Sequence, residues 1–218
     1  MKRFIFAVLF FITVLIFPTQ NVRAEELEAQ IASSSEISKS KLTDASHYTY
    51  VTLNKDDTIT VTSKNGALIY GFYISWETEP APWIMTTDSG DISCGLNGFI
   101  HEYIALDSPS ASVTVHIPEN SVKVDQIRIF GEGELPHDVQ VWNLPCERAD
   151  IMVVSSHADD EHLFLGGAMP LYAYEYDAAV QVVYMCEFRT TGQSVREHEK
   201  LDGLWEAGIR NYPVCGNF

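Results

Sequence analysis

The sequence predicts two folded parts of different class, an all-β sandwich followed by a parallel α/β sheet. Between residues 48 and 142, apolar and polar side chains alternate in short runs separated by turn residues, the period of strands with one buried face. From residue 151 onward, two continuous apolar runs are each followed by a stretch of helical spacing, which is the order of a parallel sheet. We therefore predict a jelly-roll-like β-sandwich that precedes an incomplete, Rossmann-like α/β sheet.

The first 24 residues have the pattern of a secretory signal peptide. Lys2 and Arg3 are basic, residues 4–17 are apolar, and Val22 and Ala24 put small side chains at the positions that define cleavage. The apolar run is shorter than the roughly 20 residues that span a bilayer. We predict cleavage and export, so that the protein is secreted without a transmembrane span; an uncleaved anchor is the alternative.

Residues 25–46 are polar and rich in Ser, Glu and Lys, which predicts a linker. The predicted sandwich domain follows at residues 47–146. Its expected strands are residues 48–53, 58–62, 112–117, 124–130 and 138–142.

Two of these stretches, residues 125–131 and 136–142, resemble the closing strands of galactose-binding-like jelly rolls. The domain also contains aromatic residues that could form a sugar-stacking platform. Because aromatic side chains more often fill interiors, we predict that they are core. These residues are Tyr70, Phe72, Tyr73, Trp76 and Trp83.

Residues 149–218 form the predicted α/β part. The runs at residues 151–155 and 179–185 predict strands that are buried on both faces. Helices are expected at residues 163–177, with Pro170 opening the longer part, and at residues 195–209. In the second helix, Leu201, Leu204 and Trp205 lie on one face at spacings of three and four. Since two strands and two helices bury too little surface to close a core, we expect this to be the N-terminal part of a larger domain.

Composition limits the partners and the cysteine chemistry. The net charge of −16 disfavours nucleic acid, whose binding relies on basic side chains. The four cysteines show no CxxC spacing, which argues against zinc-knuckle and redox motifs. Cys94 and Cys146 either form a disulfide after export or remain two buried thiols, and the sequence leaves both readings open.

The most informative motif is the run from His157 to Leu163, directly after the first apolar strand. It contains His157, Asp159, Asp160, Glu161 and His162. In open parallel sheets, ligands bind beyond the carboxyl ends of strands, and imidazole and carboxylate are ordinary zinc ligands. Of two adjacent acids, one can bind metal while the other takes a proton from metal-bound water.

A structural alternative exists for the same run. Asp159 and Asp160 could stabilise the start of a helix through its dipole. We expect Glu161 to support the loop or the helix start, and His162 to be structural or exposed.

The run resembles the signature of the PIG-L/LmbE-like zinc-dependent N-deacetylases, with Ala158 in place of the usual proline. A second block that begins at Arg196 resembles the family's Arg-x-x-Glu helix, and together they cover about residues 150–214. The resemblance implies that His157 and Asp160 bind Zn²⁺. It further implies that Asp159 is the general base and that Arg196 contacts the substrate.

The implied reaction is hydrolysis of the acetamide of an N-acetylglucosamine-type sugar or glycoconjugate. The family's third zinc ligand and the acid for the leaving amine are expected beyond residue 218. We regard His198 as a weaker candidate than Arg196 and as equally consistent with a solvated helix residue. His47, His101, His116 and His137 show no ligand spacing.

Two alternatives to the deacetylase remain open. One is a secreted carbohydrate- or surface-binding protein, in which the sandwich acts and the α/β part is vestigial. The other is a metal-dependent phosphoesterase that uses the same two carboxylates.

Overall fold

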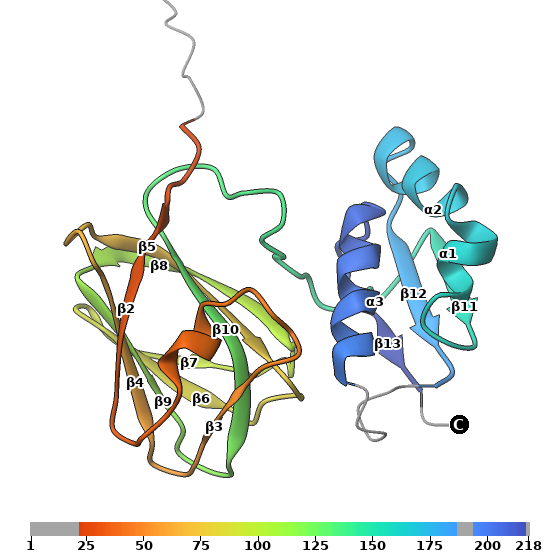
Figure 1. The fold of residues 1–218 in the computed structure, drawn as a ribbon. Coiled ribbons are helices and arrows are strands. Elements are labelled where there is room, and N and C mark those ends of the chain that lie inside the picture. The colour runs from red at the N-terminus through yellow and green to blue at the C-terminus, as the bar shows by residue number, and fades with distance from the viewer. Residues whose placement is uncertain (1–21, 187–193, 217–218) are drawn as a thin grey trace, which may run out of the picture.

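The computed structural model describes residues 22–186 and 194–216. A β-sandwich is followed by a connecting segment and a smaller unit that contains a parallel sheet (Figure 1). Most of the predicted signal peptide, residues 1–21, lies outside the described residues. Among the described residues, no helix has the length and the apolar character needed to cross a membrane.

The sandwich consists of two five-stranded antiparallel sheets. In the first, the order is β1-β10-β5-β8, and β3 also pairs with β10. In the second, the order is β2-β4-β9-β6-β7. The strands of the first sheet are β1 (Glu26–Leu27), β3 (Val51–Leu53), β5 (Ile69–Trp76), β8 (His101–Ser110) and β10 (Val122–Phe130), and those of the second are β2 (Ala29–Ser33), β4 (Thr58–Ser63), β6 (Trp83–Thr87), β7 (Gly90–Cys94) and β9 (Ser112–His116).

The alternation in the sequence corresponds to the burial of the strands. In β4 and β9, every second side chain is buried and the others are half-buried, as expected for strands with one face against a core. Four of the five aromatic residues assigned to the core are buried, which confirms that prediction. They are Phe72, Tyr73, Trp76 and Trp83, while Tyr70 is half-buried.

The prediction of a linker at residues 25–46 is wrong. This segment contains β1, β2 and the 3₁₀ helix η1 (Lys39–Leu42). β1 pairs with β10 and β2 pairs with β4, so backbone hydrogen bonds hold the segment although it has few apolar side chains. Leu27 and Leu42 are nevertheless buried in the core, and the segment belongs to the sandwich.

β10 contains a bulge at Asp125. Val124 pairs with Trp76 and Gln126 with Ser75, so Asp125 is an extra residue without a partner on β5. A bulge interrupts the alternation of the two faces. As a result, Val124 and Asp125 are both fully buried, and a carboxylate lies where the sheet would otherwise turn a side chain outward.

The strand predicted at residues 138–142 is absent, and an irregular segment stands in its place. Val139, Gln140 and Trp142 are buried, but their partners are side chains and not a neighbouring strand. Gln140 contacts His101 and accepts a hydrogen bond from Trp142. The alternation of apolar and polar residues in this stretch therefore reflects packing against α3 and against β8, the edge strand of the first sheet, and not strand pairing.

The C-terminal unit has a three-stranded parallel sheet in the order β11-β12-β13. This order follows the prediction, but a sheet of this size does not by itself show a Rossmann-like fold. α3 lies on the side that faces the sandwich, and α1 lies farther away (Figure 1). The elements are β11 (Ile151–Ser155), α1 (Asp160–Leu165), α2 (Ala168–Pro170), the π-helical turn η2 (Leu171–Glu175), β12 (Val180–Tyr184), α3 (Ser194–Glu206) and β13 (Val214–Cys215).

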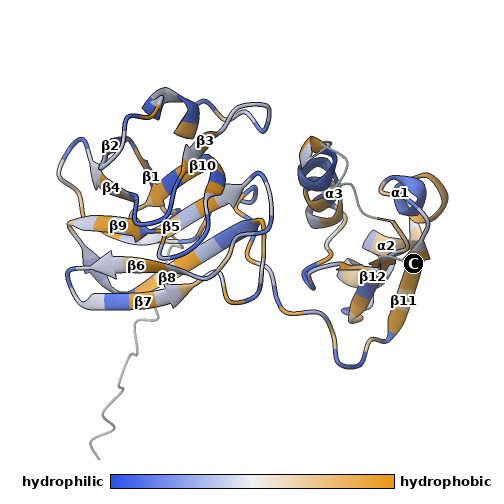
Figure 2. Cartoon of the chain, turned by 90° about the horizontal axis from the view of Figure 1, so that it is seen from below, coloured by the Kyte–Doolittle hydropathy of each residue, from blue (hydrophilic) through white to orange (hydrophobic). Residues whose placement is uncertain are grey.

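Two details of this unit differ from prediction. β11 is hydrophobic along most of its length (Figure 2), yet Met152 and Val154 are 65% and 56% exposed, so β11 is buried on one face and not on both. The helix expected at residues 163–177 is divided into α1, α2 and η2, and Pro170 is both the last residue of α2 and the N-cap of η2. β12 is buried as expected, and so are Leu201, Leu204 and Trp205 on α3.

All four cysteines are free thiols. Cys94 is buried and Cys146 is half-buried, so no disulfide joins them. Burial raises the pKa of the Cys94 thiol to about 12, which keeps it protonated and unreactive at neutral pH.

Candidate functional site

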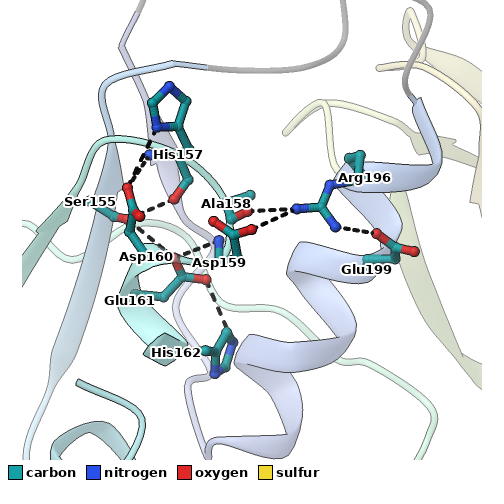
Figure 3. A network of polar contacts seen from close by, with 9 residues as sticks. All are labelled: Ser155, His157, Ala158, Asp159, Asp160, Glu161, His162, Arg196 and Glu199. Atoms are coloured by element: carbon teal, nitrogen blue, oxygen red, sulfur yellow. Dashed lines mark hydrogen bonds and ion pairs between the residues drawn. The ribbon is translucent and has the colours of Figure 1, made fainter. Parts of the chain in front are cut away.

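The structure brings the predicted metal pair together at the carboxyl end of β11 (Figure 3). His157 Nδ1 lies 3.5 Å from Asp160 Oδ2, and the same carboxylate accepts a hydrogen bond from the His157 backbone N–H at 3.1 Å. The His157 side chain is 60% exposed. This is a pair of groups at the surface, with room for metal ligation but without an enclosed site.

Asp159 and Arg196 are paired with each other. Arg196 Nη2 donates to Asp159 Oδ2 at 3.1 Å and to the Ala158 carbonyl at 3.0 Å, and Nη1 donates to Glu199 at 2.8 Å. The hydrogen bond to Glu199, opposed in part by desolvation and supported by Asp159, raises the pKa of Arg196. The loop after β11 is thereby tied to α3 (Figure 3).

The backbone at Asp159 has an unusual conformation, with φ of 132°, a region in which non-glycine residues are strained. Glu161 supports this loop, as predicted: its buried Oε2 accepts hydrogen bonds from Ser155 Oγ at 3.2 Å and from the Asp159 N–H at 3.1 Å. Asp159 occupies the N-cap position of α1 but makes no side-chain capping bond. Its side chain serves the ion pair with Arg196 instead.

A larger polar cavity lies between the sandwich and α3, with a volume of about 480 Å³. This volume is in the usual range for small-molecule sites, roughly 300–1,000 Å³. β1, β5, β10, the loop after η1 and α3 all contribute to it. Its main lining residues are Glu26, His47, Tyr73, Gln126, Arg128, Asp138, Gln140, Asp202 and Trp205.

Arg128 is held rigidly in one wall of this cavity. Its guanidinium donates to both oxygens of Glu26, at 2.9 and 2.6 Å, and to Asp138 at 2.7 Å. Burial alone would lower the pKa of Arg128, but the ion pairs with Glu26 and Asp138 raise it above its ordinary value. The arrangement presents fixed hydrogen-bonding groups to the cavity.

Gln140 connects the cavity to the buried interior. Its Nε2 donates to Asp202 Oδ1 at 2.6 Å, while its Oε1 accepts from Trp142 Nε1 at 2.8 Å. Because the indole N–H can only donate, the amide oxygen of Gln140 points toward Trp142 in the interior, and its amide nitrogen points toward Asp202 in the cavity. Burial raises the pKa of the Asp202 carboxyl, and His47 and the Gln140 bond oppose that shift.

Three histidines meet beside the cavity, and we call His47, His101 and His198 the histidine cluster. His101 Nδ1 lies 2.6 Å from Gln140 Oε1 and therefore carries a proton, and its Nε2 lies 2.7 Å from His198 Nδ1. Burial first, and then the neighbouring His198 and His47, hold the pKa of His101 well below its usual value. His101 is thus neutral, with its Nε2 lone pair directed at His198.

His198 connects the cluster to the bulge in β10. Its Nε2 lies 2.7 Å from Asp125 Oδ2, and both side chains are fully buried. His47 stacks on His198 with ring centroids 4.1 Å apart, and its Nδ1 lies 3.8 Å from the same carboxylate oxygen. A buried carboxylate is costly unless positive charge compensates it, so the cluster is a site where cationic charge is favoured.

Sequence reasoning missed this cluster. For His198 the sequence left open a weak candidate site residue and a solvated helix residue, and its full burial excludes the second reading. His47 and His101 show no ligand spacing in the sequence. The three residues come from a loop, from β8 and from α3. The hydrogen-bonded pair of His101 and His198 is separated by 97 residues in the sequence. The sequence contained one signal. His198, Asp202 and Trp205 recur at helical spacing, and their side chains all lie on the side of α3 that contacts the sandwich and the segment after it.

Comparisons with known proteins give structural neighbours alone, since no protein-family model and no curated protein matches the chain. The carbohydrate-binding module of family 32 from AlyQ, solved with 4,5-unsaturated mannuronic acid, is 8% identical, with a TM-score of 0.39 over 50% of this chain and 99% of that one. The family 32 module of Clostridium perfringens NanJ, solved with galactose, is 9% identical, with a TM-score of 0.38 over 47% of this chain and 93% of that one.

A third neighbour, also from Clostridium perfringens and solved with GalNAc-β-1,3-galactose, is 9% identical, with a TM-score of 0.42 over 49% of this chain and 100% of that one. These findings correct the sequence interpretation. These structural neighbours are carbohydrate-binding modules, and no family model or curated protein supports a PIG-L/LmbE-like deacetylase. The predictions of a deacetylase, and of a metal-dependent amide hydrolase, are therefore wrong.

Proposed function

We propose that this protein binds carbohydrate, and that the cavity between the sandwich and α3 is the binding site. The observation that carries the proposal is the lining of that cavity. Planar polar side chains (Gln126, Arg128 and Gln140) and carboxylates such as Asp138 stand beside Tyr73 and Trp205. Sugar hydroxyls both donate and accept hydrogen bonds, and such amide, guanidinium and carboxylate groups satisfy them in pairs. The proposal rests on this cavity and not on the neighbours, whose TM-scores are below 0.5.

The charge of the cavity favours a neutral ligand. Glu26, Asp138, Asp202 and Glu206 line it together with a single arginine, Arg128, which is already paired with two of these acids. An anionic sugar would meet uncompensated carboxylates, and such like-charge contacts reduce affinity. We therefore infer a neutral sugar, and an N-acetylated amino sugar is the more specific ligand that the sequence suggests.

Calorimetric titration of the full chain tests the proposal. Galactose, N-acetylglucosamine and N-acetylgalactosamine are compared with a uronic acid as the anionic control. Gln126→Ala removes a half-buried amide from the cavity wall, and Gln30→Ala removes an exposed amide from β2 on the other sheet. We expect binding of a neutral sugar that Gln126→Ala weakens and Gln30→Ala leaves unchanged. Absence of binding to every neutral sugar at tens of millimolar would refute it.

Three sequence predictions remain as proposals. The first is export, which N-terminal sequencing of secreted protein would test by locating cleavage after Ala24. The second is Zn²⁺ binding by His157 and Asp160, with Asp159 and Arg196 beside them, which loss of zinc affinity in His157→Ala would support. The third is a Rossmann-like arrangement of the C-terminal unit, with which the strand order β11-β12-β13 is consistent.

A further inference from the structure

We propose that the histidine cluster is a binding site for a divalent transition metal of the Zn²⁺ class. One ring nitrogen from each of His47, His101 and His198 lies within 4.8 Å of the others. Imidazole is a preferred ligand of Zn²⁺ and its neighbours in the periodic table, and three protein ligands with a further open position form a common zinc geometry. This site does not depend on sugar binding.

The second nitrogen of each buried ring is already oriented by an oxygen. His101 Nδ1 donates to Gln140 Oε1 at 2.6 Å, so His101 Nε2 is the free ligand atom. His198 Nε2 faces Asp125 Oδ2 at 2.7 Å, so His198 Nδ1 is the free ligand atom. Histidines that bind metals almost always pair their other nitrogen with a carboxylate or carbonyl oxygen, which fixes the tautomer. Both pairings are in place here.

The two free nitrogens need a small movement to accept the metal. They lie 2.7 Å apart and share one proton, whereas zinc–nitrogen bonds of about 2.0–2.1 Å at tetrahedral angles separate ligand atoms by about 3.3 Å. The metal would displace that proton and move the rings apart by about 0.6 Å. Such a shift is within the ordinary freedom of side chains.

His47 is the ligand that must reorient. Its ring lies nearly parallel to that of His198, with an interplanar angle of 9°, so its nitrogen reaches a common metal after rotation of the ring. His47 stands in the loop between η1 and β3, its side chain is 26% exposed, and it lines the cavity. The cavity therefore gives the metal a path to the cluster.

Charge favours the metal as well. The Asp125 carboxylate is fully buried, and it faces His198 Nε2 at 2.7 Å and His47 Nδ1 at 3.8 Å. A dication bound by the cluster would compensate the charge of this carboxylate. Because His47 and His101 belong to the sandwich and His198 to α3, the metal would also fasten the two parts of the molecule.

Zinc titration of the metal-free full chain, followed by calorimetry, tests the site without any sugar. Two control variants each remove one histidine elsewhere in the sandwich: His137→Ala, in the segment after β10, and His116→Ala, at the end of β9. His47→Ala removes the part-exposed ligand without opening the core. We expect His47→Ala to lose at least tenfold in zinc affinity, and added imidazole to restore part of it.

Asp125→Asn provides a second test that leaves all three ligands in place. Loss of an outer partner of a ligand typically costs about 10–100-fold in metal affinity, and that is the loss expected here. Co²⁺ bound to the wild type should give the intense visible absorption of a tetrahedral site, and His47→Ala should weaken it. The proposal is overturned if the wild type binds no zinc, or if His47→Ala binds it as tightly as His137→Ala.

Discussion

The sandwich and the C-terminal unit cover their apolar surfaces to very different degrees. In the sandwich, the inward side chains of two five-stranded sheets enclose one another, and residues such as Val115 are fully buried. In the C-terminal unit, β11 exposes Met152 and Val154, and α1 exposes Leu163 and Phe164. A period of two in the sequence identifies which face is buried. A continuous apolar run identifies a strand but says nothing about how many layers cover it.

The largest expected effect concerns His198, a residue of α3 that contacts the sandwich. Removal of one partner from a buried ion pair typically costs about 3–5 kcal/mol, because the other charge remains buried. His198→Ala should therefore lower the free energy of unfolding by about that amount, as measured by urea denaturation in the presence of a chelator. His116→Ala, which removes a half-exposed histidine on β9, should change it by less than about 0.5 kcal/mol.

If His198→Ala and His116→Ala proved equally mild, α3 would not be anchored to the sandwich through this pair. The double variant Asp125→Leu/His198→Leu gives a further check. Replacement of both partners by apolar groups is often neutral, so it should recover much of the stability lost in His198→Ala.

An effect of intermediate size is expected when the same substitution, Val to Thr, is made in each of the two regions. Val115→Thr in β9 places a hydroxyl in the closed core and should cost about 1–3 kcal/mol, the price of a buried polar group without a partner. Val154→Thr in β11 puts the same hydroxyl at a side chain that is 56% exposed, where less than about 0.5 kcal/mol is expected. Equal urea midpoints for the two variants would mean that β11 is covered in solution.

The smallest effect is a pH dependence within the sandwich. Burial raises the pKa of Glu102 from 4.5, although hydrogen bonds from the Gly95 N–H and Trp83 Nε1 oppose the shift. The folded state therefore holds this proton more tightly than the unfolded state. Its contribution to stability is present below pH 4.5 and is lost as the pH rises through the folded pKa.

Thermal unfolding of the wild type and Glu102→Gln between pH 4 and pH 7 measures this contribution. The melting temperature of the wild type, relative to that of the variant, should fall as the pH rises. A relative gain for the wild type over the same range would contradict the sign of the shift.

The sequence predicted the positions of the strands and helices better than it predicted their pairing partners and the number of faces that are buried. The strands at β4, β9 and β10 follow from alternation, and the buried residues of α3 follow from helical spacing. Two strands in residues 25–46 could not be predicted, because pairing with β10 and β4 holds them and no local pattern does. The exposed face of β11 was missed for the complementary reason, since an apolar strand does not reveal whether a second layer is present.

The proximity of candidate site residues was predictable where they lie within one loop. His157, Asp159 and Asp160 are close in sequence, and the structure keeps His157 and Asp160 together. The cavity and the histidine cluster depend on contacts between segments far apart in the chain, such as His101 with His198. Their assembly follows from the packing of α3 on the sandwich, which no sequence spacing encodes.

The bulge at Asp125 shows how a single inserted residue can place a charge on the face that the sandwich turns toward α3 without disturbing the strand around it. The pairing of β10 with β5 resumes at Gln126 and continues to Phe130. Deletion of Asp125 should therefore yield a β10 strand of regular alternation. It would remove the carboxylate that faces His198 and leave the register of both flanking segments intact. In β10, the number of residues and not the choice of side chains decides whether a carboxylate is buried beside α3.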